Sequence, residues 1–178
     1  MSNKPPLISF IGWSGSGKTT FFEQVVRNLS ADEVKVGLIK HISFDTQLDT
    51  PGKDSWRYEQ AGASPVIAAS EHQYAVFRSI HEERTLAPMA DDIAAECDVI
   101  LAEGHRVQAS SVIEFRRMTH KKHDPIFDLE RLTAIVCDDA SVRDEASRLG
   151  VPAFDLDDTE AVAEFIEEVI RSGLCTNW

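Results

Sequence analysis

LISFIGWSGSGKTT, residues 7–20, decides the fold, because an apolar run passes directly into a loop rich in glycine. Residues 12–19 match the pattern G-x-x-x-x-G-K-[ST] at every fixed position. The run from Leu7 to Ile11 predicts a buried strand. The next apolar positions are spaced as one face of a helix and are Phe21, Phe22, Val25, Val26 and Leu29. A strand before the motif and a helix after it are the context that a phosphate-binding loop requires.

Each residue type in this loop has a physical role in holding a nucleotide. Glycines let the backbone wrap closely around phosphate oxygens, and the N–H groups at the start of a helix attract negative charge. We expect Lys18 to reach the β- and γ-phosphates and the Thr19 hydroxyl to bind Mg²⁺. The predicted nucleotide-binding residues of the loop are Gly12, Ser14, Gly15, Ser16, Gly17, Lys18, Thr19 and Thr20. The alternative is a glycine-rich turn that matches the pattern by chance.

An acidic residue is expected at the end of a neighbouring strand, where it would assist the metal. The apolar run from Val99 to Ala102 ends in Glu103 and Gly104. We predict that Glu103 holds the water shell of Mg²⁺ or orients an attacking water, which makes it both a metal-binding and a catalytic candidate. An exposed glutamate at a strand end is the alternative interpretation.

Apolar runs alternate with helical patterns along the rest of the chain. Further strands are predicted at 34–39, 99–102, 112–115 and 134–137, and a hairpin at 65–69 and 74–77. Helices are predicted from Asp54 as N-cap to Ala61, along Met89, Ile93 and Cys97, from a capping box at Ser141 to Gly150, and from Val162 to Ile170. This alternation predicts a three-layer α/β P-loop NTPase fold, with a mainly parallel sheet and an inserted β-hairpin, as a single domain over residues 1–178.

Composition narrows the classes of function. The chain has 178 residues, 43% of them hydrophobic, and a formal charge of −12, which disfavours a nucleic-acid partner. No run approaches the roughly 20 apolar residues of a membrane span, and no signal peptide is evident at the start. The three cysteines are far apart and indicate neither a zinc site nor a disulfide framework. We expect a cytoplasmic protein that contacts neither nucleic acid nor membrane.

The segment from His41 to Arg57 follows a predicted strand end, where ligands collect in open α/β sheets. Asp45 and Asp49 are candidates for assisting the metal, and Lys53 and Arg57 for meeting anionic phosphates. The alternative is a solvated loop with a turn and a helix cap.

Several short segments together resemble the MobB family, the molybdopterin-guanine dinucleotide biosynthesis adapter proteins. They are GLIKH at 37–41, PGKDS at 51–55, AGA at 61–63, AEG at 102–104 and IEFR at 113–116. The resemblance implies a GTP-binding, weakly GTP-hydrolysing homodimer that needs Mg²⁺. Such proteins bind the molybdenum cofactor guanylyltransferase, which attaches GMP to molybdopterin, and help to present nucleotide or cofactor.

The resemblance also carries over to particular residues. It implies that loop 12–20 holds the phosphates and that Glu103 is the strand-end acid. It also implies that the loop facing the site carries His41, Asp45, Asp49, Lys53 and Asp54. The chain departs from the family at Ser43 and Phe44, where some relatives have histidines. It also has His105 and Arg106 where an aromatic residue and a lysine are expected; Arg106 keeps a basic group for a phosphate contact.

Two weaker signals concern base recognition and a basic patch. Asp138 follows a predicted strand and is a candidate for reading guanine, although the Asn-Lys pair that makes the GTPase motif specific is missing. Basic residues gather between Arg116 and His123. They could form a lid over phosphates, a docking site for an anionic pterin, a contact with an acidic partner, or simply a solvated loop.

Three functions remain open at this point. The first is a nucleotide-dependent adapter acting with a guanylyltransferase. The second is a stand-alone small-molecule kinase, for which the patch from Arg116 to His123 is the candidate lid. The third is a GTPase metallochaperone, in which His41, His105 and Asp45 would gather around a metal. The edge strands of the predicted hairpin would suit a homodimer.

Overall fold

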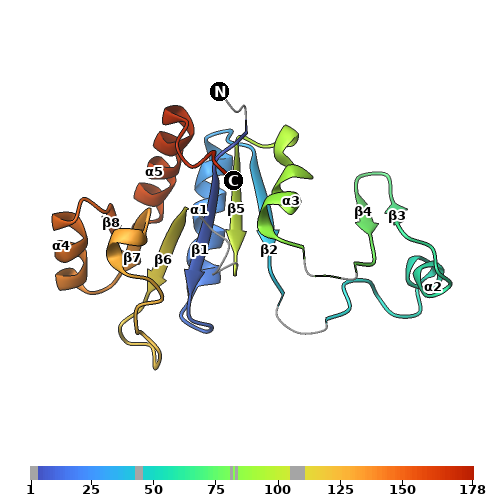
Figure 1. Cartoon of the computed structure of the whole chain (residues 1–178), viewed down its shortest axis with the longest axis horizontal. Helices are drawn as coiled ribbons and strands as arrows, with labels where there is room; N and C mark the ends of the chain where they lie inside the picture. Colours follow the sequence, from blue (N-terminus) through green and yellow to red (C-terminus); the bar gives the residue numbers. More distant parts are fainter. Residues whose placement is uncertain (1–3, 43–45, 81, 83, 105–110) are drawn as a thin grey trace. The chain divides into compact units, whose positions relative to one another are not determined.

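The computed structural model describes residues 4–42, 46–80, 82, 84–104 and 111–178. The chain divides into two compact units (Figure 1). The sheet unit comprises residues 1–41 and 85–178, and the hairpin unit comprises residues 42–84. The phosphate-loop motif and Glu103 both belong to the sheet unit, so the core of the predicted site lies within one compact body.

The sheet unit is built on six parallel strands. Their bounds are β1 Leu7–Gly12, β2 Val36–Lys40, β5 Val99–Glu103, β6 Val112–Arg116, β7 Ala134–Cys137 and β8 Ala153–Phe154. They lie in the order β2-β5-β1-β6-β7-β8, and every neighbouring pair is parallel. The predicted parallel sheet is confirmed. The central strands β1, β5, β6 and β7 are buried on both faces, which explains their continuous apolar runs.

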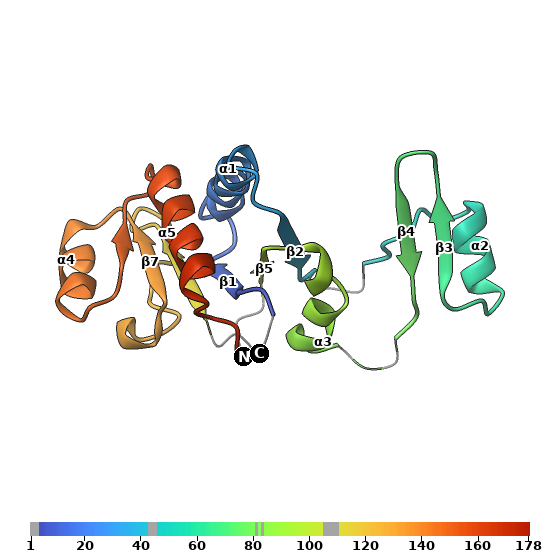
Figure 2. The ribbon, with the colours of Figure 1, turned by 90° about the horizontal axis from the view of Figure 1, so that it is seen from above.

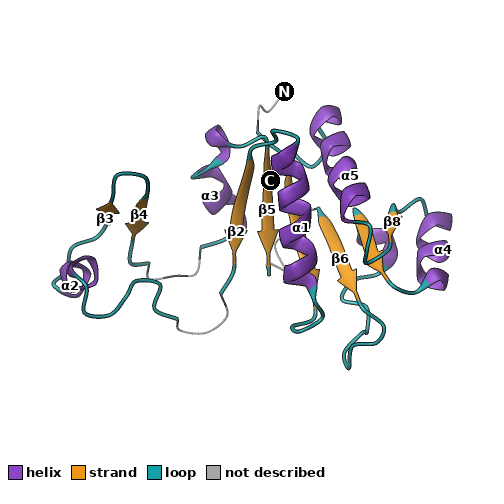
Figure 3. Ribbon diagram, turned by 180° about the vertical axis from the view of Figure 1, so that it is seen from behind, coloured by secondary structure: helices purple, strands orange, loops and turns teal. Residues whose placement is uncertain are grey.

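Helices cover both faces of this sheet and give the three predicted layers. Their bounds are α1 Lys18–Ala31, α3 Leu86–Asp91, α4 Ala140–Arg148 and α5 Thr159–Ser172, with short 3₁₀ turns at Ala94–Glu96 and Leu129–Arg131. Helices α1 and α5 pack together against one face (Figure 3). Helices α3 and α4 contribute to two separate clusters on the other face (Figure 2). None of the described helices is both long and apolar enough to cross a membrane.

Aromatic contacts fix the start of α1 over the sheet. The rings of Phe10 and Phe22 lie 4.6 Å apart between centroids, and those of Phe21 and Phe115 lie 5.3 Å apart. All four side chains are buried, and such pairs add about 0.5–1.5 kcal/mol each beyond the area they bury. The helix therefore begins at a defined place above the carboxyl ends of β1 and β6.

Three details of the predicted helices are wrong. The N-cap of α4 is Asp139, whose carboxylate accepts hydrogen bonds from the N–H groups of Ser141 (2.8 Å) and Val142 (3.4 Å), so Ser141 is not the cap. Helix α2 (Asp54–Gln60) is preceded by Lys53 as N-cap, and Asp54 is its first residue. The helix predicted through Cys97 ends at Asp91, because the chain must become extended at Cys97 to enter β5.

The hairpin unit consists of α2 and an antiparallel strand pair, β3 Val66–Ala69 and β4 Tyr74–Phe77. The predicted hairpin is confirmed. Val66 is buried, and α2 packs against β3. Ile67 lies opposite Val76, and both side chains are exposed.

Candidate functional site

The loop between β1 and α1 has a backbone that only glycines permit. Gly15 and Gly17 have φ angles of 80° and 91°, in the left-handed region that other residues rarely adopt. A Cβ atom on Gly12 would lie 2.7 Å from the carbonyl oxygen of Phe115. Gly12 and Gly17 stand at fixed positions of the motif and Gly15 at a variable one, and the backbone at all three favours glycine. The strand, loop and helix lie in the predicted order.

The loop carries polar groups that suit an anion. Gly17 is the N-cap of the 14-residue helix α1. Because glycine has no side chain, it cannot accept hydrogen bonds from the first N–H groups of the helix. Ser16 is 3% exposed, and its Oγ has no hydrogen-bond partner among the described residues. A buried hydroxyl without a partner beside an uncapped helix start is a place where phosphate oxygens would satisfy both.

Glu103 lies at the centre of the site. It is 4% exposed, and its Oε1 accepts a hydrogen bond from the Thr19 hydroxyl at 3.1 Å. The same oxygen pairs with the ammonium group of Lys18, while Oε2 pairs with that of Lys40. Strand order explains this convergence, because β5 lies between β1 and β2 and Glu103 is in register with Phe10 and Lys40.

The charges around Glu103 decide its protonation state. Burial by itself would raise the pKa of this carboxyl group. The hydrogen bonds and charges of Lys18 and Lys40 outweigh that effect, so the pKa of Glu103 is lowered from its ordinary value. Glu103 is thus a carboxylate at neutral pH, and it holds the lysine that the motif assigns to phosphate.

Part of the basic patch lies directly against the phosphate loop. The Arg117 Nε donates to the carbonyl oxygen of Ser16 at 2.7 Å. The Trp13 indole N–H donates to the carbonyl oxygen of Asp124 at 2.9 Å. The Lys122 ammonium lies 5.4 Å from the centre of the Trp13 ring. We call residues 117–124 the covering segment.

Arg116 points away from these contacts and into the fold. It is 6% exposed, and its Nη2 lies 2.9 Å from Oε1 of Glu114, which is 1% exposed. The Glu114 carboxylate also accepts from the backbone N–H groups of Ile126 and Phe127, at 3.2 Å each. This buried ion pair anchors the chain just after the covering segment.

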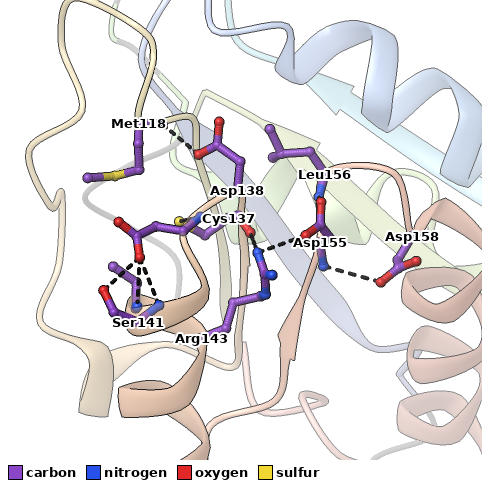
Figure 4. A network of polar contacts seen from close by, with 10 residues as sticks. Met118, Cys137, Asp138, Ser141, Arg143, Asp155, Leu156 and Asp158 are labelled. Carbon is purple, nitrogen blue, oxygen red and sulfur yellow. Dashed lines mark hydrogen bonds and ion pairs between the residues drawn. The ribbon is translucent and has the colours of Figure 1, made fainter.

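Asp138 lies at the same edge of the sheet. Its Oδ1 accepts from the Met118 N–H at 2.7 Å, which ties the end of β7 to the covering segment (Figure 4). Beside it, Arg143 of α4 bonds the Cys137 carbonyl and pairs with Asp155 at 2.8 Å. Reading of guanine by Asp138 stays a prediction.

The other predicted site residues are less well placed. Ser14 and Thr20 are exposed, one in the loop and one in the first turn of α1. Lys53 precedes α2 in the hairpin unit, not in the sheet unit that holds the phosphate loop. Asp45 and Arg106 lie outside the described residues, and so does His105. The roles predicted for Lys53, Asp45 and Arg106 remain predictions.

Sequence reasoning missed Lys40 and Trp13 as members of the site. Lys40 ends β2 and so lies at the carboxyl edge of the sheet, a position that could have marked it beforehand. Its partner depends on β5 being the neighbour of β2, which residue spacing does not reveal. Trp13 is a variable position of the motif, and nothing in the sequence indicates its contact with Asp124.

The residues present fit a Mg²⁺–nucleotide. Mg²⁺ prefers oxygen ligands, commonly takes only one or two from the protein, and completes its shell with water and phosphate. The Thr19 hydroxyl and the Glu103 carboxylate are adjacent and are ligands of this kind. Within the described ranges no group of three or more His, Cys, Asp or Glu side chains could hold a metal ion. The donor set therefore suits a metal held largely through the nucleotide.

Comparison with known proteins gives consistent results. The family model for molybdopterin guanine dinucleotide synthesis protein B, MobB, matches residues 7–138. The molybdopterin-guanine dinucleotide biosynthesis adapter protein of Escherichia coli K12 is 32% identical over 170 residues, which cover 92% of each chain. The protein of the same name from Haemophilus influenzae is 35% identical over 129 residues, 72% of each chain. A crystal structure of molybdopterin-guanine biosynthesis protein B superposes with a TM-score of 0.70 at 26% identity, covering 93% of this chain and 99% of that one.

Proposed function

Because the chain belongs to the MobB family, we propose that it is an adapter in molybdopterin guanine dinucleotide biosynthesis that binds GTP with Mg²⁺. In this role it assists the molybdenum cofactor guanylyltransferase, the enzyme that forms the dinucleotide. The adapter role rests on the names of relatives that align with most of the chain. The proposal of nucleotide binding is based on the phosphate loop, and the proposed preference for guanine is based on the family resemblance.

One observation carries the nucleotide part of the proposal: Lys18, Thr19 and Glu103 converge at the mouth of a glycine loop. The backbone N–H groups of the loop hold the phosphate oxygens. Lys18 would exchange its contact with Glu103 for the phosphates, and Thr19 and Glu103 would hold Mg²⁺ or its water shell. Mg²⁺ held there would supply positive charge against the phosphate chain.

The same geometry supports slow hydrolysis. Glu103 is the catalytic candidate, but Lys40, which would stay paired with it after Lys18 turns to the phosphates, lowers the pKa of its carboxyl group. A carboxylate with a depressed pKa is a poor acceptor for the proton of an attacking water. Glu103 can orient that water without being an effective base, which suits a protein that holds nucleotide more than it consumes it.

Further parts of the proposal rest on sequence position and on the family resemblance. They are phosphate contacts by Lys53 and Arg106, a metal contact by Asp45, guanine recognition by Asp138, molybdopterin as a candidate ligand, a homodimer, and a cytoplasmic location. The kinase and the metallochaperone remain competing hypotheses, and the metallochaperone depends on His105 and Asp45 outside the described residues.

Titration with fluorescent GTP and ATP analogues in Mg²⁺ tests the nucleotide part. We expect GTP to bind more tightly than ATP, and Lys18→Ala to weaken binding by about 10- to 100-fold, the equivalent of losing one charge-assisted hydrogen bond. Lys35→Ala is the control, because this exposed lysine precedes β2 and so lies at the amino end of that strand, away from the carboxyl end where Lys40 meets Glu103. Preference for ATP would favour the kinase, and binding that is indifferent to Lys18→Ala would refute the phosphate-loop assignment.

The partner is tested separately, with purified guanylyltransferase. We expect it to bind the wild-type chain, and GTP to be hydrolysed slowly whether or not this partner is present. Fast nucleotide consumption stimulated by a small acceptor, without binding to the guanylyltransferase, would contradict the adapter role.

A further inference from the structure

We propose that Arg117 is a second cationic contact for the phosphate chain of the nucleotide, held in place by the covering segment. The inference rests on the proposed nucleotide binding and extends it to a residue outside the phosphate-loop motif. Residue spacing left the basic patch with four interpretations. The contacts in the sheet unit favour the one in which it closes over phosphates.

Strand register places Arg117 at the phosphate loop. Strand β6 pairs with β1, and Phe115 is in register with Gly12, so the chain emerges from β6 beside the start of the loop. The Arg117 Nε then donates to the Ser16 carbonyl at 2.7 Å. Its Nη2 lies 3.2 Å from the point where a Cβ on Gly17 would be. The guanidinium group thus lies against the N-cap of α1, on the backbone that would surround a phosphate.

The guanidinium keeps donors available for such a phosphate. It has five N–H groups, and only the bond from Nε to Ser16 is made among the residues that the structure describes. No described carboxylate pairs with it, although the chain carries a formal charge of −12. Beside it, the buried Ser16 Oγ is without a partner in the same described residues. A phosphate group would accept from both, and Arg matches phosphate oxygens with paired N–H groups.

Several contacts hold the covering segment in one place, which a solvated loop would not need. Trp13 donates to the Asp124 carbonyl, and Met118 donates its N–H to Asp138. Beyond the segment, the Glu114 carboxylate accepts from two further backbone N–H groups. The guanidinium is therefore ordered before ligand arrives, so less conformational entropy is lost on binding.

This arrangement predicts a contact with phosphate and not with the base. Loss of Arg117 should weaken the binding of GTP and ATP analogues by the same factor. It should also weaken the binding of inorganic tripolyphosphate, measured by competition. The loss should shrink at high salt, because an ionic contact near the surface is screened. A residue that only supports the loop would change folding stability without these signatures.

The test compares Arg117→Ala, Arg117→Lys and the control Lys35→Ala in equilibrium binding with Mg²⁺. Lys35 is exposed and precedes β2, at the end of that strand away from the phosphate loop. We expect about 10-fold weaker binding for Arg117→Ala, partial recovery for Arg117→Lys and no change for Lys35→Ala. Urea unfolding without nucleotide checks that each variant is folded. If Arg117→Ala is unfolded, the comparison of Arg117→Lys with wild type decides, because its point charge should still bind less tightly than the guanidinium.

Lys18→Ala, measured in parallel, separates the two proposals. If it weakens binding while Arg117→Ala leaves affinity unchanged, Arg117 is a structural residue and this inference is wrong. If neither variant changes affinity, the phosphate-loop assignment fails and the inference fails with it. Weakening by both, equal for GTP and ATP analogues in the case of Arg117→Ala, supports the inference.

Discussion

Two lysines and one threonine share the carboxylate of Glu103, and this sharing sets the charge balance of the site. Replacing the carboxylate in Glu103→Gln leaves the ammonium groups of Lys18 and Lys40 facing a neutral amide. We expect the free energy of unfolding without nucleotide to fall by about 1–2 kcal/mol at neutral pH, as for the loss of a charged hydrogen-bond acceptor. Urea unfolding of both proteins between pH 8 and pH 3.5 measures the difference.

The pH dependence of that difference follows from the direction of the pKa shift. The folded pKa of Glu103 is lowered from 4.5, so its contribution is fully present above that value and is lost as pH falls through the lower folded pKa. The gap between wild type and Glu103→Gln should be constant from pH 8 to 5 and close only below pH 4.5. Glu164→Gln, on the exposed face of α5, should show no such gap. A gap that closes near neutral pH would contradict the charge assignment.

At the scale of single residues, the motif predicts more than the spacing elsewhere does. A fixed pattern constrains backbone and chemistry together, and Lys18 and Thr19 do lie beside the glycine loop and Glu103. Their contacts with a nucleotide stay a prediction. Lys40 was missed because its partner lies on another strand, and side-chain pairs across a parallel sheet depend on strand order. Lys53, Asp45 and Arg106 were predicted from loop position and resemblance, which do not fix where a loop lies.

At the scale of elements, the end of β6 is held by a buried ion pair between Glu114 and Arg116. Arg116→Met leaves a buried carboxylate without its cation, and we expect a loss of about 3–5 kcal/mol in the free energy of unfolding. The double variant Glu114→Gln with Arg116→Met should lose less, because it leaves no buried charge unpaired, although its one amide oxygen can replace only one of the two oxygens that accept from Ile126 and Phe127. Chemical denaturation with two-state fitting measures both.

A matched control comes from an exposed pair on α5. Arg171 lies 3.4 Å from Glu167 at i,i+4 spacing, with its side chain 66% exposed. Arg171→Met should cost only about 0–1 kcal/mol. An equal, small cost for Arg116→Met would mean that Glu114 and Arg116 do not stabilise the end of β6.

Helices and strands were predicted best where the apolar pattern continued over many residues. The five longer strands of the parallel sheet, the hairpin, α1 and α5 were all found from their patterns. Strand β8 was missed because it consists of only two residues, Ala153 and Phe154, which is too few to show an alternating apolar pattern. The N-cap of α4 was misassigned because Asp139 and Ser141 are both good caps, and only the backbone geometry selects between them.

At the scale of the whole molecule, the hairpin unit exposes an apolar surface that the sheet unit's chemistry does not use. Ile67, Tyr74 and Val76 are 63%, 70% and 47% exposed, and the register of β3 and β4 puts them on one face. An isolated two-stranded hairpin is marginally stable in water, and exposed apolar clusters commonly mark interaction surfaces. The homodimer in the proposed function would cover this face with its counterpart from a second copy.

Ile67→Asp tests that arrangement, because an aspartate on this face would be buried without a partner in a dimer. We expect light scattering after gel filtration to give the mass of a dimer for wild type and of a monomer for Ile67→Asp. Gln73→Asp adds the same charge at the hairpin turn, away from the apolar face, and should remain dimeric. GTP binding by the Ile67→Asp monomer should persist, because the phosphate loop, Glu103 and Arg117 all belong to the sheet unit. If the wild-type protein is a monomer, there is no homodimer. If the Ile67→Asp variant is still a dimer, the contact between the two copies lies outside this apolar face.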